Sequence, residues 1–156
     1  MAALLAVDAK ELACVMIPLA ADTHLLLPNV TIAEILPWRR IKPLPDAPKW
    51  CLGLLGWRGE TVPVIQFEAL NGGEFLGGGR SRCLLIMNRA RRSTGRAFYG
   101  LASSGLPRIV HLSDDDLQNR AVRLGAAEVA ALRVGTESAV VPNLSYIEEQ
   151  LATLND

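Results

Sequence analysis

The sequence predicts an all-β protein made of many short strands. Its apolar residues fall in short runs separated by Pro, Gly, Asn and Asp, the pattern of strands joined by turns. Half of the 156 residues are hydrophobic but only 5% are aromatic, so the core must be mainly aliphatic. A chain of this length forms one domain, or two small lobes that share a core. We expect fewer than about a quarter of the residues to be helical.

The strand pattern is clearest at a β-hairpin in the middle of the chain. Two apolar runs, 51–57 and 61–67, flank the short link 58–60. Gly59 in this link can adopt a positive φ, which a residue with a Cβ adopts only at a cost. Arg58 is the only charged residue between Cys51 and Gly59, so the hairpin holds one cation at its tip.

Two kinds of residue inside this hairpin constrain its backbone. Gly53 and Gly56 lie within the first run, where glycine often marks a bulge or the close approach of another backbone segment. Pro63 has no N–H to donate to a strand ladder. We therefore expect the second strand to lie at a sheet edge or beside a bulge.

The remaining elements follow from the same reasoning in chain order. Strands are expected at 11–19, 24–27, 82–88, 96–102, 108–112, 128–134 and 138–141. Short helical turns are expected at 30–33, with Asn29 as the cap, and at 67–70. After Pro142, either Asn143 or Ser145 can cap a C-terminal helix, because Ser145 and Glu148 have the spacing of a capping box.

The connecting segments differ in stiffness. The Pro-rich segment 43–48 should be extended, since proline fixes φ. The segment 71–80 holds five glycines and predicts a flexible surface loop, at which we place the division between two lobes. A phosphate-binding P-loop does not fit there, because Glu74 stands where the first glycine is required and lysine is absent.

Composition and motifs exclude several classes of function. The formal net charge is zero, whereas a nucleic-acid-binding protein usually carries a basic surplus. Cys14, Cys51 and Cys83 lie in separate apolar runs without a Cys-x-x-Cys motif, which favours buried reduced thiols over a zinc or redox site. The N-terminal sequence lacks the basic region of a signal peptide, and no apolar run reaches the ~20 residues that span a bilayer.

Residues that could support chemistry are few. His24 and His111 are better explained as structural or surface residues, although a triad of one of them with Asp22 or Asp114 and a serine is conceivable. The run 114–116 could bind a cation but lacks the alternating spacing of a calcium loop. A basic segment with Arg89, Arg91, Arg92 and Arg96 surrounds an expected hairpin turn at 93–95 and is better explained as a solvated tip than as a phosphate site.

The central hairpin resembles the CheW-like coupling proteins of bacterial chemosensory systems. Their pattern G-v-x-n-l-R-G-x-x-l-P-v-i-d-L matches residues 53–67 in register, except that Gly56 replaces Asn and Gln66 replaces Asp. Ile32, Glu34 and Ile35 match a V-x-E-I/V element that precedes this hairpin in the family. The resemblance is looser in the second half, where the family's acidic residues are replaced at 102–104 and 142–144.

This resemblance covers roughly residues 10–152 and implies a single CheW-like domain. The implied fold is mainly β, with two SH3-like five-stranded barrels packed around a shared core. Lobe 1 would span about 20–70 and lobe 2 about 80–142, followed by a C-terminal helix at 143–153. The departures from the pattern indicate a divergent member of the family, for which we expect a pathway of surface or pilus-driven motility.

The resemblance also implies a non-catalytic, cytoplasmic adaptor without cofactor or metal. Its partners would be the regulatory domain of a CheA-type histidine kinase and the cytoplasmic tip of a chemoreceptor, with no nucleic acid and no membrane insertion. The implied contact residues are Arg58, Glu34, Trp57 and Gly59, although Arg58 could equally form a structural ion pair. The alternatives are a small-ligand-binding β-barrel, which needs a concave apolar cavity with convergent polar groups, and, third, a hydrolase. An adaptor should instead have a filled core and an exposed apolar groove between its lobes.

Overall fold

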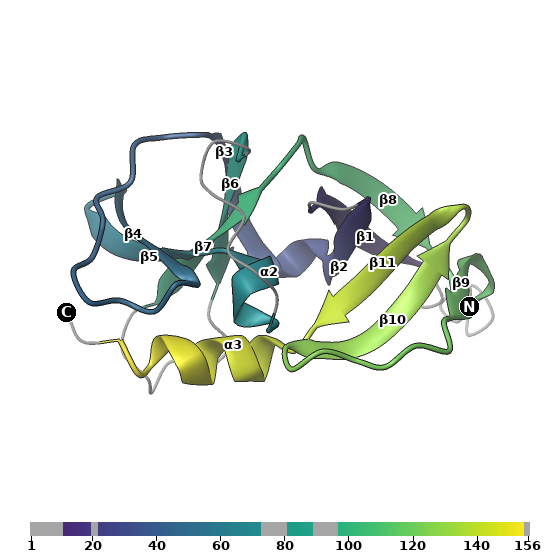
Figure 1. Cartoon of the computed structure of the whole chain (residues 1–156). Coiled ribbons are helices and arrows are strands. Elements are labelled where there is room, and N and C mark those ends of the chain that lie inside the picture. The colour runs from purple at the N-terminus through teal and green to yellow at the C-terminus, as the bar shows by residue number, and fades with distance from the viewer. Residues whose placement is uncertain (1–10, 20–21, 73–80, 89–96, 155–156) are drawn as a thin grey trace.

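The computed structural model describes residues 11–19, 22–72, 81–88 and 97–154. The described residues form two β-sheets and a few short helices (Figure 1). Strands account for 52% of the described residues and helices for 14%, so the expectation of a mainly β protein with less than a quarter helix is confirmed. None of the described helices has the length and apolar character of a membrane span.

A six-stranded sheet combines strands from both ends of the chain, in the order β8-β1-β2-β11-β10-β9. Neighbouring strands are antiparallel except β2 and β11, which pair in parallel. The strands are β1 (Leu12–Pro18), β2 (Thr23–Pro28), β8 (Arg108–Leu112), β9 (Leu117–Asn119), β10 (Glu128–Val134) and β11 (Glu137–Pro142).

A five-stranded sheet is formed by the middle of the chain, in the order β3-β6-β7-β5-β4. Only β5 and β7 pair in parallel. The strands are β3 (Ile32–Pro37), β4 (Cys51–Trp57), β5 (Glu60–Ile65), β6 (Cys83–Asn88) and β7 (Phe98–Ser103). The 3-10 turn η1 (Asn29–Thr31) carries the chain into this sheet, and α2 (Phe67–Leu70) follows β5.

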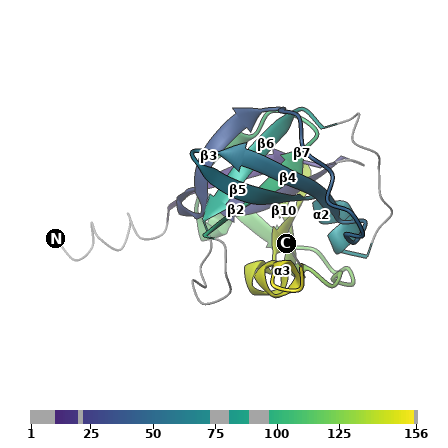
Figure 2. The ribbon, with the colours of Figure 1, turned by 90° about the vertical axis from the view of Figure 1, so that its left-hand side faces the viewer.

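The two sheets share one hydrophobic core. Val15 and Leu27 of the six-stranded sheet belong to the same buried cluster as Leu85 and Tyr99 of the five-stranded sheet. The C-terminal helix α3 (Leu144–Leu151) leaves β11 and runs beneath the five-stranded sheet (Figures 1 and 2), where its residues Ile147 and Leu151 complete this cluster. Each sheet also encloses a smaller cluster of its own.

Helix α3 begins at one of the two expected caps. The side chain of Asn143 accepts a hydrogen bond from the backbone N–H of Tyr146 at 3.1 Å. Asn143 therefore satisfies one of the free N–H groups of the first turn, and Ser145 lies inside the helix instead.

One polar contact ties the two halves of the molecule together directly after α2. The side chain of Asn71 donates to Glu128 Oε2 at 2.6 Å and accepts from the N–H of Ala127 at 2.8 Å. Glu128 in turn accepts from the N–H of Gly125 at 3.0 Å. The segment leading into β10 is thus fixed to the end of α2 by hydrogen bonds as well as by the core.

The sheet pairing divides the chain differently from the expected lobes at 20–70 and 80–142. Strands β6 and β7 pair with β3 and β5, and not with β8–β11. Strands β6 and β7 therefore belong with the central hairpin, while β1 and β2 belong with the C-terminal half. The Gly-rich segment thus connects strands of the same lobe. A glycine-rich composition does not determine which strands pair, so it does not mark a lobe boundary.

Several local expectations also need correction. The hairpin turn contains only Arg58 and Gly59, since Glu60 already pairs with Trp57 as the first residue of β5. Asn29 lies within η1, which follows Pro28 without a side-chain cap. The helical turn expected at 30–33 is wrong at residues 32 and 33, which begin strand β3; residues 34–36 and 117–119, for which no strand was expected, lie in β3 and β9.

Pro63 does not lie in an edge strand, since β5 sits between β7 and β4. Its partner across β4 is Leu54, whose N–H and C=O bond to Lys42 instead of to β5. Pairing of β5 with β7 begins only at Val64. The missing N–H of Pro63 thus falls at a position where the ladder requires no donor.

Other expectations fall outside the described residues. These are the turn at 93–95 with Arg89, Arg91, Arg92 and Arg96, and most of the Gly-rich loop, 73–80. The signal-peptide question concerns residues 1–10, which are also outside the described part.

Candidate functional site

The tip of the β4–β5 hairpin is a two-residue turn that presents Arg58. The pair Trp57–Glu60 closes it, and both central residues have positive φ, 47° at Arg58 and 76° at Gly59. Positive φ at both positions defines the type I′ turn that suits the twist of a hairpin. The positive φ expected at Gly59 is confirmed. The left-handed conformation of Arg58 costs about 1–2 kcal/mol.

The base of the hairpin is fixed by the close approach of a second backbone segment at Gly53. Gly53 has φ 139°, and a Cβ placed there would lie 2.2 Å from the carbonyl oxygen of Lys42. Lys42 and Leu54 exchange two backbone hydrogen bonds of 2.8 and 2.9 Å at this point. A bulge lies between Cys51 and Gly53. The sequence expectation of a bulge or a close backbone approach is correct at Gly53 but not at Gly56, where no atom lies within 4 Å of a Cβ and the strand pairing is regular.

At the tip, Glu34 contacts two of the other residues that the family resemblance implies, Trp57 and Arg58. The indole N–H of Trp57 donates to Glu34 Oε1 at 2.8 Å, and Arg58 Nη2 lies 3.2 Å from the same oxygen. Glu34 is on β3 and Trp57 on β4, which form opposite edges of the five-stranded sheet. The sheet therefore curls until its two edges meet through side chains.

The three side chains differ strongly in exposure. Trp57 is only 7% exposed, whereas the side chains of Arg58 and Glu34 are 71% and 33% exposed. The guanidinium carbon of Arg58 lies 5.2 Å from the centre of the Trp57 ring, within the range of a cation–π contact. An ion pair this accessible contributes only ~0–1 kcal/mol to folding. The ion pair therefore holds the Arg58 side chain in place but adds little to the stability of the fold.

Phe98 completes the site and was not identified from the sequence. Its ring packs edge-to-face on Trp57 with centroids 4.8 Å apart. Phe98 is on β7, and the sequence identifies it only as an apolar strand residue. No local signal links positions 57 and 98, because the contact depends on how the sheet is paired and curled.

The other residues considered for chemistry do not form a catalytic or metal site. His24 Nε2 lies 3.3 Å from Glu137 Oε2, and Arg108 pairs with the same carboxylate, so His24 belongs to a surface charge cluster. Within the described ranges, no three His, Cys, Asp or Glu side chains come together as metal ligands. All three cysteines are buried and none of them forms a disulfide, as expected.

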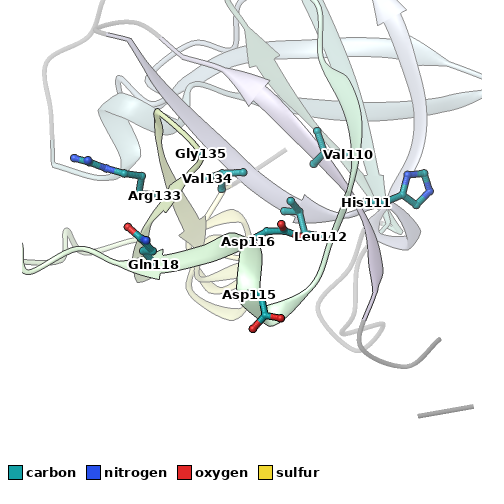
Figure 3. Close-up of a pocket in the computed structure, with 9 residues that line it drawn as sticks. All are labelled: Val110, His111, Leu112, Asp115, Asp116, Gln118, Arg133, Val134 and Gly135. Atoms are coloured by element: carbon teal, nitrogen blue, oxygen red, sulfur yellow. The ribbon is translucent and has the colours of Figure 1, made fainter. Parts of the chain in front are cut away.

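An open hollow of about 600 Å³ lies beside the acidic turn η4 (Asp114–Asp116). It is lined by residues of β8, η4, β9 and β10, among them His111, Asp116 and Arg133. Figure 3 shows that His111 and Arg133 point away from Asp116 on opposite sides. The polar groups do not converge, so the hollow lacks the arrangement that a small-ligand site requires.

A second, apolar pocket of about 440 Å³ opens within the six-stranded sheet. Its walls are mainly leucines, including Leu12, Leu112 and Leu132, and its polar residues are Ser113 and Asp114. Both polar residues come from the same short turn. This pocket offers apolar contact but no convergent polar groups from separate elements, and it lies within one lobe, not in the groove between lobes expected for an adaptor.

Comparisons with known proteins agree with this architecture. The family model of the CheW-like domain matches residues 13–148. Among solved structures, the scaffolding protein TtCheW from Thermoanaerobacter tengcongensis is similar, with a TM-score of 0.67 and 18% identity over 84% of this chain and 88% of that chain. No curated protein matches the sequence. The fold is thus that of two SH3-like β lobes with a C-terminal helix.

Proposed function

The chain belongs to the CheW-like family, and on that basis we propose that it couples chemoreceptors to a CheA-type histidine kinase. Family membership makes the chain a non-catalytic scaffold of chemotaxis signalling. The finer proposal concerns its partners: the regulatory domain of the kinase and the cytoplasmic tip of the receptor. Both are presented in the cytoplasm, where we place the adaptor, next to the membrane receptors.

The observation that carries the contact proposal is the exposed, ordered Arg58 at the hairpin tip. One of its N–H groups faces Glu34, and within the described part of the chain its other donors have no partner. Arginine is over-represented in protein interfaces, where its planar group binds carboxylates and carbonyls. We assign the partner contact to Arg58, Glu34, Trp57 and the backbone at Gly59.

The mechanism would be mass action on a rigid body. An adaptor that binds receptor and kinase through two moderate surfaces turns the second binding event into an intramolecular one. The shared core and the Asn71 contact support such rigidity, because they fix the two lobes to each other. No catalytic step is needed for this effect.

We extend the proposal to an array that controls surface or pilus-driven motility. The support is the set of departures from the family pattern at Gly56, Gln66, Ala102 and Pro142. Of these, Gly56 lies on the exposed part of β4 one residue before Trp57, close to the proposed contact. Deleting the gene and scoring both swimming and twitching would test this extension; a defect in swimming alone would contradict it.

Substitution of Arg58 tests the contact itself. Arg58→Ala should leave the melting temperature within a few degrees, since an exposed pair contributes ~0–1 kcal/mol. The same change should weaken binding of a receptor tip or kinase regulatory domain about tenfold or more, equivalent to ~1.4 kcal/mol. Glu34→Ala should act in the same direction but less strongly.

Thermal melts and titrations of these variants separate the two roles of Arg58. Unfolding of Arg58→Ala would establish a structural role. Unchanged stability together with unchanged binding of both partners would remove the hairpin tip from the contact surface.

A further inference from the structure

Glu34 Oε1 contacts two nitrogen groups of very different exposure: it accepts a hydrogen bond from one and forms an ion pair with the other. One is the N–H of the buried Trp57 indole at 2.8 Å, and the other is Nη2 of the exposed Arg58 at 3.2 Å. We propose that Trp57 is a positioning residue: its N–H fixes the Glu34 carboxylate, which then holds the Arg58 guanidinium in the orientation that the partner binds. This proposal rests on the proposed contact at Arg58, and it limits the part of the buried Trp57 in that contact to an indirect one, made through Glu34 and Arg58.

The indole is the rigid member of the group. Trp57 is buried in the cluster that Leu36, Leu55 and Val64 form inside the five-stranded sheet, and Phe98 packs on its ring at an interplanar angle of 67°. Its N–H therefore points in a fixed direction. Glu34 lies on the edge strand β3, where Trp57 and Arg58 are the only described residues that bond its carboxylate.

Arg58, by contrast, has little to hold it apart from Glu34 and the Trp57 ring. It sits in a two-residue turn with 71% of its side chain exposed. Immobilising such a side chain on binding costs about 0.5–1.5 kcal/mol. In the free protein the Arg58 guanidinium is already held between the Glu34 carboxylate and the indole face. Part of this cost is therefore avoided when the partner binds.

Trp57→Phe tests the role of the N–H, because phenylalanine keeps a smaller aromatic ring in the cluster and removes the donor; Trp38→Phe removes the same ring volume without removing this donor. Glu34 is partly exposed, and water can replace the lost donor. We expect binding of the kinase regulatory domain or the receptor tip to weaken about three- to tenfold. Trp38→Phe is the matched control, since Trp38 packs against the same cluster without contacting Glu34.

A double-mutant cycle shows whether Trp57 acts through Arg58. Trp57→Phe should weaken binding in the wild-type background and add nothing in the Arg58→Ala background. An equal loss in both backgrounds would overturn the inference, because Trp57 would then affect the partner independently of Arg58. No loss in the wild-type background, or an equal loss for Trp38→Phe, would overturn it as well.

A measurement on the free protein separates this inference from the proposed function. The indole ¹⁵N–¹H signal of Trp57, assigned from its absence in Trp57→Phe, should shift in Glu34→Ala while the Trp38 signal stays. The Arg58 side-chain signals should become those of a mobile arginine in Trp57→Phe. If these changes occur but Arg58→Ala binds normally, the contact proposal fails alone; if they are absent, the positioning role fails whatever the partner binding.

Discussion

Replacing Gly53 with alanine tests how the hairpin that carries Arg58 is anchored. The new Cβ would lie 2.2 Å from the oxygen and 2.8 Å from the carbonyl carbon of Lys42, and 2.9 Å from Cγ2 of Ile41. Contacts under 3.0 Å are not tolerated, and two of these atoms are backbone. Either the segment through Lys42 or strand β4 must move.

The expected cost follows from what this movement disrupts. The two hydrogen bonds between Lys42 and Leu54 contribute ~1 kcal/mol each. The φ of 139° adds strain of about 1–3 kcal/mol for a residue with a Cβ. The lower entropy of the unfolded alanine chain offsets only ~0.4–1 kcal/mol. We therefore expect a loss of about 3 kcal/mol, or a fall in Tm of roughly 10 °C for a domain of this size.

Gly56→Ala is the matched control three residues further along the same strand. No atom lies within 4 Å of a Cβ at this exposed position, and its φ is not positive. Its stability should stay within about 1 kcal/mol of the wild type, on the stabilising side. Thermal melts and urea titrations of both variants give the comparison. A normal melt for Gly53→Ala, or an equal loss for Gly56→Ala, would refute the anchoring at Lys42.

Two further predictions concern the core and the contact between the lobes. Asn71→Ala should lower the free energy of unfolding by about 2–3 kcal/mol in a urea titration, because it leaves Ala127 N–H and Glu128 without their partner; an unchanged midpoint would show that the core alone fixes the lobes. Burial raises the pKa of the Cys14 thiol in the folded protein above its usual value of 9.0. The protonated thiol therefore contributes stability that is fully present below pH 9.0 and is lost as pH rises through the folded pKa. Urea titrations across this range should therefore show a weaker alkaline loss of stability in Cys14→Ala, and parallel curves would contradict it.

Local sequence signals predicted the hairpin well. The Arg-Gly pair between two apolar runs indicates a turn, and Gly53 within a strand indicates a bulge or a close backbone approach, because glycine alone adopts these conformations cheaply. The same reasoning located most strands and the helix beginning after Asn143. These features depend on residues close together in the chain, which is why the sequence was sufficient.

The arrangement of the lobes depends on pairing between distant strands and could not be derived in this way. Whether β6 pairs with β3 or with β8 is decided by packing across the shared core, and the Gly-rich segment gives no information on it. The contact of Glu34 with the indole of Trp57 likewise exists only because the sheet curls. Asn71 begins a glycine-rich stretch that predicts only a loop, so no sequence signal indicated that its side chain joins the lobes.

The central claim is that this chain holds a chemoreceptor and a CheA-type kinase together, and a sequential titration tests it most directly. The kinase regulatory domain is titrated into the protein alone and into the protein saturated with a receptor cytoplasmic tip. We predict binding in both cases, with a ternary complex in size-exclusion chromatography and weakened assembly for Arg58→Ala. Failure of either partner to bind, or displacement of the receptor tip by the kinase domain, would contradict the account.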